Sequence, residues 1–289
     1  MFAPSDMSKP MFHNLNSRQS CDPSNANRFH FCQLARKSLW LLSRAGKSTL
    51  TAMMTLSAPG ITDTRPERDV YNALLQLDGK NILELGCGRA EITRTIATEG
   101  TDRRITALEV DEIQHQNHLL IDDLPNVEFI KAGAENIPCS DNKFDVLFMF
   151  KSLHHVPLDL MEQALLEINR VLKPGGFAYI SEPVFAGGFN DLLKMFHDEQ
   201  VVRLAAFEAI KESVETGLMS LEQQYFFNSP ICFENFADFE QKILKVTHTD
   251  HRLDDDLYAR VKEQFESHMH EDGASFQMPI RIDLLRKGN

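Results

Sequence analysis

Five short apolar runs recur between residues 81 and 181, each separated from the next by a stretch with helical character. They are Asn81–Leu85, Ile105–Val110, Val127–Ile130, Asp145–Phe150 and Phe177–Ser181. Strands that alternate with helices at this spacing form crossover units, and such parallel sheets are covered by helices on both faces. The crossovers are nearly always right-handed. The pattern therefore predicts an α/β fold on a doubly wound, mostly parallel sheet.

The chain on either side of these runs predicts further elements. Thr64 and Glu67 have the spacing of a capping box, which indicates a helix from about Arg65 to Leu77. Residues 184–245 carry long helical patterns and an aromatic-rich stretch, so we expect a helical insertion whose aromatic side chains form its own core. The closing elements are a strand near Val246–Arg252, a helix from Asp254 to about His270 and a strand at Pro279–Leu285. The sheet would then have seven strands, with an antiparallel last strand.

Residues 1–60 differ in composition from the rest of the chain. They contain seven basic residues and two acidic ones, are rich in Ser and Asn, and show no clean periodicity. We expect a disordered or spurious N-terminal extension; an organelle address and a helix that caps the active site are the alternatives. Residues 61–289 then form the folded domain.

Composition limits the function classes. The net charge is -12 although residues 1–60 are basic, so the body of the chain is acidic and a poor match for a phosphate backbone, which Lys and Arg bind. No nucleic acid partner is expected. No stretch approaches the roughly 18 apolar residues of a membrane span. The five cysteines are scattered and form no C-x-x-C pair, which favours a reducing, cytoplasmic setting.

The first predicted strand leads into a glycine-containing turn, Glu84-Leu85-Gly86-Cys87-Gly88. Glycines here let the backbone turn tightly and let a ligand approach it. In doubly wound sheets, ligands bind at this carboxyl edge, near the start of the next helix. The dinucleotide fingerprint needs a third glycine where Glu91 stands, which disfavours a nicotinamide-dependent dehydrogenase. The carboxylate of Glu84 suits a cationic ligand better than a pyrophosphate.

This turn resembles motif I of the class I, Rossmann-like S-adenosylmethionine-dependent methyltransferases, of the type 11 or UbiE-like kind, with Ala90 in place of the last glycine. Four later segments also resemble that family, in the family's order: Ala107–Asp111, Ala132–Pro138, Phe144–Val156 and Glu167–Gly176. Glu109 stands at the family's acidic ribose-binding position, with Asp111 as the second choice. The resemblance covers roughly residues 64–183 and implies S-adenosylmethionine as cofactor. The cofactor-binding residues that it implies are Glu84, Gly86, Cys87, Gly88, Glu109, Val110, Ala134, Glu135 and Phe150.

One departure concerns the segment that the family places beside the adenine. Gly133 occupies the position of the family's aspartate, so the backbone of Ala134, or Glu135, is left as a substitute contact. Lys151 is also unusual, because a cation fits poorly beside a sulfonium. We expect its side chain to point away from the cofactor.

Three residues are candidates for the catalytic base: His155 and His154, just after the fourth strand, and Glu182 at the end of the fifth. One histidine ring could instead cap the loop through a backbone carbonyl. Cys87 is not expected to act as a nucleophile, because methyl transfer needs no enzyme thiol. His248 and His251 lie three apart on an expected strand and so face opposite ways, and the sequence predicts no metal site.

The leading hypothesis is a methyltransferase acting on a small-molecule acceptor, with residues 184–245 as the lid that selects it. The alternative is a non-catalytic, methyltransferase-like protein that binds the cofactor or a partner chain for regulation. Gly133 and Lys151 are the features that favour the alternative.

Overall fold

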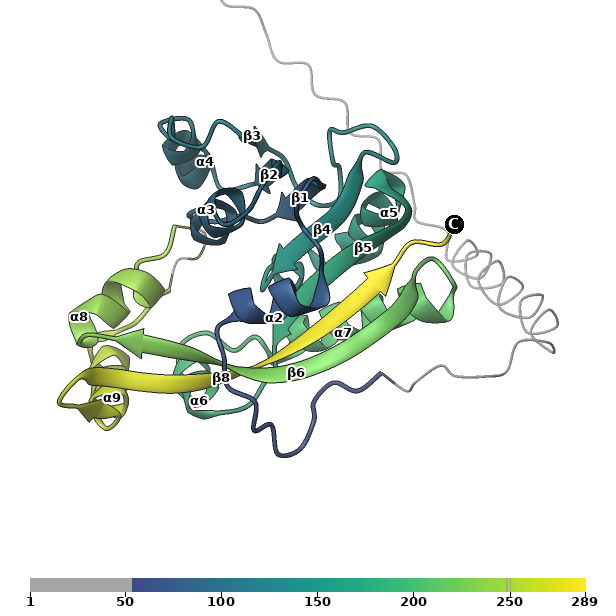
Figure 1. Ribbon diagram of the computed structural model, residues 1–289. Helices are drawn as coiled ribbons and strands as arrows, with labels where there is room; N and C mark the ends of the chain where they lie inside the picture. The colour runs from purple at the N-terminus through teal and green to yellow at the C-terminus, as the bar shows by residue number, and fades with distance from the viewer. Residues whose placement is uncertain (1–53, 248, 250) are drawn as a thin grey trace, which may run out of the picture. The chain divides into compact units, whose positions relative to one another are not determined.

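A computed structural model describes residues 54–247, 249 and 251–289. Their strands form one mixed sheet in the order β3-β2-β1-β4-β5-β8-β6, with the short β7 paired to β8 outside this path (Figure 1). The strands are β1 (Asn81–Leu85), β2 (Arg104–Glu109), β3 (Val127–Lys131), β4 (Phe144–Phe150), β5 (Leu172–Pro183), β6 (Ser220–Phe233), β7 (Met269–His270) and β8 (Gly273–Arg286).

The five predicted apolar runs are β1 to β5, and their pairings with one another are all parallel. The order runs outward from β1 to β2 and β3 on one side, and to β4 and β5 on the other. The direction of winding therefore reverses between β1 and β4. This is the switch point where a doubly wound sheet opens a crevice at the carboxyl ends of its strands.

The antiparallel closing strand is also confirmed. β8 contains the predicted run Pro279–Leu285 and pairs antiparallel with both β5 and β6. The path thus holds seven strands, as expected, but the two-residue β7 raises the number in the sheet to eight.

The prediction for the sixth strand was wrong. Ser220–Phe233, expected within a helical insertion, is the long edge strand β6, and the described residues of 246–252 form no strand. Aromatic side chains fit a pleated, half-buried surface, and cross-strand partners on β8 favour the extended form over the helix. Pro230 is tolerated because β6 lies at the edge of the sheet, where its missing N–H leaves no gap inside the ladder.

Helices cover both faces of the sheet. The helices are α2 (Glu67–Leu74), α3 (Glu91–Thr98), α4 (Glu112–His118), α5 (Met161–Val171), α6 (Gly188–Leu193), α7 (Gln200–Glu215), α8 (Phe236–Phe239) and α9 (Asp255–Glu266). Short 3-10 turns span Leu153–His155 and Leu158–Leu160, and a π turn spans Glu240–Leu244. One core cluster packs α5 and α7 against the sheet, and a second packs α2 and α3 against the opposite face.

A third cluster of aromatic side chains lies where β6 and β8 extend beyond the parallel strands, beside α6, α8 and α9 (Figure 1). Phe233, Phe239 and Phe265 are buried in it. Phe233 and Phe239 of the 184–245 region are therefore core residues, as expected, but the core is not the region's own because Phe265 and Phe276 also form it. Among the described residues, no helix is both long and apolar enough to span a bilayer.

Two predicted helices exist with changed ends. α2 is shorter than Arg65–Leu77 and has no side-chain cap: Thr64 forms a β-bridge with Asn228, and Glu67 binds Lys151, so the capping box was wrong. α9 begins after Asp254, whose side chain accepts from Leu257 N, and ends before His270.

The expected N-terminal extension, residues 1–60, lies outside the described residues as far as residue 53. Met54 packs against the first core cluster, and Thr55 N donates to Gln224.

Candidate active site

The turn after β1 depends on two glycines with left-handed backbone. Gly86 has φ +70° and Gly88 has φ +52°. A Cβ atom at Gly86 would lie 2.8 Å from Ser152 Cβ, whereas one at Gly88 would meet nothing within 4 Å. The amides of Gly86 and Cys87 both donate to Leu108 O, which ties the turn to the end of β2. The close approach of Ser152 excludes any side chain at residue 86.

Ala90, which replaces the family's last glycine, also has a left-handed backbone, with φ +60°. It is the residue before α3 and is buried. Its small side chain fits, but the backbone conformation favours glycine. The departure from the motif therefore keeps the shape of the turn.

Glu84 is a buried carboxylate beneath this turn. Its side chain lies on the α3 face of the sheet, where Thr93 Oγ1 donates to Glu84 Oε2 at 2.7 Å. Burial raises the pKa of Glu84 to about 7. Glu84 also lines a cavity of about 490 Å³ whose wall includes Gly86, Cys87, Gly88 and Phe150. Five of the predicted cofactor-binding residues therefore lie around one cavity.

Burial raises the pKa of the Cys87 thiol as well. The reactive form of a cysteine is the thiolate, so a raised pKa leaves the side chain inert. This agrees with the expectation that Cys87 is no nucleophile.

Glu109, at the end of β2, faces the same turn. Its carboxylate accepts from Gly88 N at 2.7 Å and from the amides of Val110 and Asp111. Asp111 is directed elsewhere, since one of its oxygens accepts from Ile113 N and Gln114 N as the cap of α4. Val110 is exposed beside them. Glu109 and not Asp111 thus contacts the glycine turn.

Gly133, Ala134 and Glu135 follow β3. Ala134 is buried, and the Glu135 carboxylate folds back over Gly133: a Cβ built on Gly133 would lie 2.2 Å from Glu135 Oε2. The acidic group that the sequence lacks at residue 133 is thus supplied to the same space from residue 135. Neither Ala134 nor Glu135 lines the cavity around Glu84.

His118, on α4, supports the turn and was missed from the sequence. Its Nε2 lies 2.7 Å from Gly88 O, and its ring stacks on Phe129 with centroids 4.5 Å apart. The ring is buried. Nothing in the sequence connects residue 118 with residue 88, because the contact depends on how α4 packs.

The histidine pair lies on the 3-10 turn after β4, and the two rings have different surroundings. His154 is buried, and its Nδ1 donates to Glu182 Oε2. Its Nε2 lies 3.5 Å from Glu199 Oε1. His155 is exposed beside it, with ring centroids 4.1 Å apart.

Opposite charges dominate the electrostatics around His154. Burial alone would lower the pKa of His154, but Glu182 and Glu199 raise it to about 9. Burial would raise the pKa of Glu182, but His154 holds it below its usual value, and His154 and Arg203 do the same for Glu199. Glu182 Oε1 also accepts from Leu153 N at 2.9 Å. The fully buried Glu182 therefore orients His154 and the turn that carries it.

A second cavity, of about 450 Å³, opens beside these side chains. Its wall includes His154, His155, Glu199 and Arg203, with apolar side chains from α6 and β6. Lys242 and Val246 line both this cavity and the one around Glu84, so the two adjoin. Lys151 also lines it, and its ammonium group binds Glu67 on α2.

Comparison with known proteins gives partial matches. Residues 82–176 match the family described as a methyltransferase domain. A phthiotriol/phenolphthiotriol dimycocerosates methyltransferase of Mycobacterium ulcerans is 30% identical over 125 residues, which are 39% of this chain and 43% of the relative. A demethylmenaquinone methyltransferase of Listeria monocytogenes is 38% identical over 102 residues, 34% of this chain and 42% of the relative. The match thus spans less than half the length of these curated relatives.

Two solved structures share the fold over most of the chain. A Bacillus halodurans protein assigned as a methyltransferase superimposes with a TM-score of 0.53 at 16% identity, covering 77% of this chain and 98% of that one. The cyclase SpnF superimposes with a TM-score of 0.52 at 21% identity, covering 76% and 80%. At these identities the likeness concerns the fold alone, which supports more than one reaction. Residues 82–176 thus match a methyltransferase-domain family, and the sheet order and the glycine turn agree with a class I, Rossmann-like methyltransferase fold.

Proposed function

We propose that this protein transfers a methyl group from S-adenosylmethionine to a small-molecule acceptor. The observation that carries the proposal is the turn at the switch point of the sheet, where buried Glu84 and Glu109 flank a glycine backbone at a cavity. The match to a methyltransferase domain over residues 82–176 supports the same reaction.

The residues at the turn fit this cofactor. A cationic ligand would favour the ionised form of Glu84, whose burial otherwise disfavours it. Glu109 stands at a strand end where a carboxylate binds ribose hydroxyls in related folds. In our proposal Val110, Ala134 and Glu135 contact the adenine side, and Phe150 forms an apolar wall.

The second cavity is the proposed acceptor site. When bound, S-adenosylmethionine supplies a methyl group already activated on a sulfonium. The protein must then hold the acceptor in line with that group and exclude water. Phe189, Leu193 and Phe233 give this cavity an apolar wall, and the helices before and after β6 in the region 184–245 are the proposed selecting lid.

The three candidate bases have different roles in this proposal. His155, at the surface of the acceptor cavity, is placed to take the proton that an acceptor hydroxyl, amine or thiol loses on methylation. Glu182 has both oxygens occupied by Leu153 N and His154, so it is a positioning residue. His154 presents Nε2 to the same cavity.

The test is transfer of label from methyl-labelled S-adenosylmethionine to a fractionated small-molecule extract. We expect label in at least one acceptor fraction with the wild type and with Glu128→Gln, a change at an exposed strand residue, and little with Glu84→Gln. Cofactor binding without transfer to any fraction would support the non-catalytic alternative. A folded wild type that neither binds nor transfers would contradict the proposal.

A further inference from the structure

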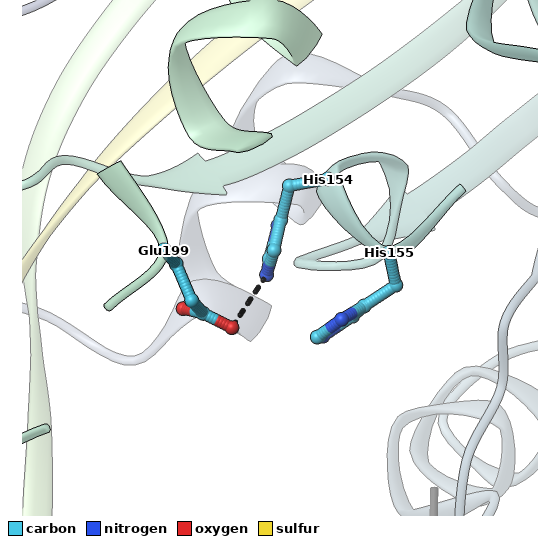
Figure 2. A group of neighbouring side chains, drawn as sticks. All are labelled: His154, His155 and Glu199. Carbon is cyan, nitrogen blue, oxygen red and sulfur yellow. Dashed lines mark ion pairs between the residues drawn. The ribbon is translucent and has the colours of Figure 1, made fainter. Parts of the chain in front are cut away.

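The side chains of His154, His155 and Glu199 converge on one space at the edge of the acceptor cavity (Figure 2). Each offers a ligand atom, and these atoms all lie within 4.8 Å of one another. We propose that this group binds a divalent transition-metal ion through the two imidazoles and the carboxylate, with a further coordination position open to the cavity.

The spacing fits a metal shared by His154 and Glu199. Ligand atoms about 2.0–2.1 Å from a tetrahedral zinc ion lie roughly 3.3 Å apart. His154 Nε2 and Glu199 Oε1 are 3.5 Å apart, and the dashed line in Figure 2 marks this ion pair. His155 lies at the cavity surface and offers a ring nitrogen within 4.8 Å of the other two ligand atoms.

Outer partners already hold the two buried ligands. His154 donates Nδ1–H to Glu182, so a metal that displaces the proton on Nε2 would find that nitrogen oriented as a ligand. Metal-binding histidines commonly have such a carboxylate partner. Glu199 uses Oε2 for the buried guanidinium of Arg203, whose Nη1 donates to Asn190. Its Oε1 faces both His154 and His197.

The charges suit a cation. Glu182 and Glu199 are both buried near His154, so two carboxylates stand around the group, and Arg203 bonds to Glu199. His197 Nε2 also lies 3.0 Å from Glu199 Oε1, so a third imidazole stands next to the group. Zinc and similar transition metals bind sites made of imidazoles and one carboxylate, whereas magnesium and calcium prefer sites made of oxygen ligands.

Three protein ligands with one open position are the pattern of catalytic metal sites. The open position would face an acceptor atom in the cavity, where a metal lowers the pKa of a bound hydroxyl or thiol and its proton passes to solvent. With the metal bound, His155 would be a ligand and would no longer act as the base. This role rests on the proposed methyl transfer, but binding of the metal does not. Metal binding and cofactor binding can therefore fail separately.

The test uses the tag-free full chain after treatment with a chelator, titrated with Zn²⁺ by calorimetry and with Co²⁺ by visible absorption. The variants are His155→Ala and Glu199→Gln, with His270→Ala as the control because His270 is exposed on β7, outside the group. We expect one tightly bound equivalent in the wild type and the control. Each ligand variant should weaken binding more than about 100-fold, above the 10- to 100-fold typical when an outer partner is lost.

Loss of Glu199 also frees Arg203, so circular dichroism must establish that Glu199→Gln folds; if it does not, His155→Ala decides alone. No binding of Zn²⁺ by the folded wild type, or equal binding by wild type and His155→Ala, overturns the proposal. Binding of the cofactor product, S-adenosylhomocysteine, is measured on the same samples. A metal-free protein that still binds it separates failure of the metal site from failure of the proposed function.

Discussion

Glu84 is a titratable group in an apolar setting, bonded to Thr93 and covered by the glycine turn. Its folded pKa of about 7 is above the ordinary value of 4.5. As pH rises from 4.5, the unfolded chain ionises Glu84 first, while the folded chain resists ionisation until about pH 7. The free energy of unfolding therefore falls through this window and levels off above it.

The Glu84→Gln variant should remove this pH dependence. Relative to the wild type, we expect its free energy of unfolding to rise by about 3 kcal/mol between pH 4.5 and 7, because 2.5 pKa units correspond to that energy. Urea unfolding at several pH values measures the difference. Glu128→Gln should leave the wild-type pH dependence unchanged. If the free energy of unfolding varied with pH in the same way for Glu84→Gln and the wild type, the raised pKa of Glu84 would be contradicted.

The two glycines of the turn give a matched pair of substitutions. Both have positive φ, so alanine at either should destabilise the fold by about 1–2 kcal/mol. Gly86→Ala should cost more than Gly88→Ala, because only its Cβ meets Ser152. Denaturant unfolding compares the two, and Ser152→Gly should restore part of the loss in Gly86→Ala. Equal losses in both variants would show that Ser152 does not restrict residue 86.

Among the elements, β8 contains a buried charge pair that no sequence pattern indicated. Arg281 Nε donates to Asp283 Oδ2 at 2.7 Å, and Arg281 pairs in register with Glu182 of β5. Both side chains of the pair are almost fully buried. Burial raises the pKa of Asp283, against the lowering effect of Arg281.

Removal of one partner should be severe. We expect Arg281→Ala to lower the free energy of unfolding by about 3–5 kcal/mol, because it leaves Asp283 buried and uncompensated. Arg286→Ala, at the exposed end of the same strand, should cost less than about 1 kcal/mol. Replacing both partners, as Arg281→Met with Asp283→Leu, should recover much of the loss. A small effect of Arg281→Ala in thermal or urea unfolding would contradict this account.

The elements that the sequence predicted are those with a local signal. The runs β1 to β5 are apolar because both of their faces are buried, and the cap at Asp254 is a contact between residues three apart. β6 was missed because its half-buried pattern resembles a helix until β8 supplies the cross-strand partners. The capping box predicted for Thr64 and Glu67 does not form, because both residues make tertiary contacts instead.

At the scale of the whole molecule, the site is assembled from segments that are distant in the sequence. Glu84, Gly86, Gly88 and Glu109 could be predicted because a strand end and a glycine turn show in the sequence. The approach of Glu199 to His154, and of Lys242 and Val246 to both cavities, depends on how the region after β5 packs against the sheet. That packing has no local pattern, so the sequence predicted no metal site, and the proposed one emerged only from the arrangement in space.

The central claim is that the turn at the switch point holds S-adenosylmethionine. Isothermal titration of the folded full chain with S-adenosylmethionine and S-adenosylhomocysteine tests it most directly. We predict one equivalent of either compound bound, at least about 10-fold weaker binding in Glu109→Gln, where a charge-assisted hydrogen bond is lost, and no change in Glu128→Gln. Absence of binding by the wild type, or equal binding by wild type and Glu109→Gln, would contradict the account.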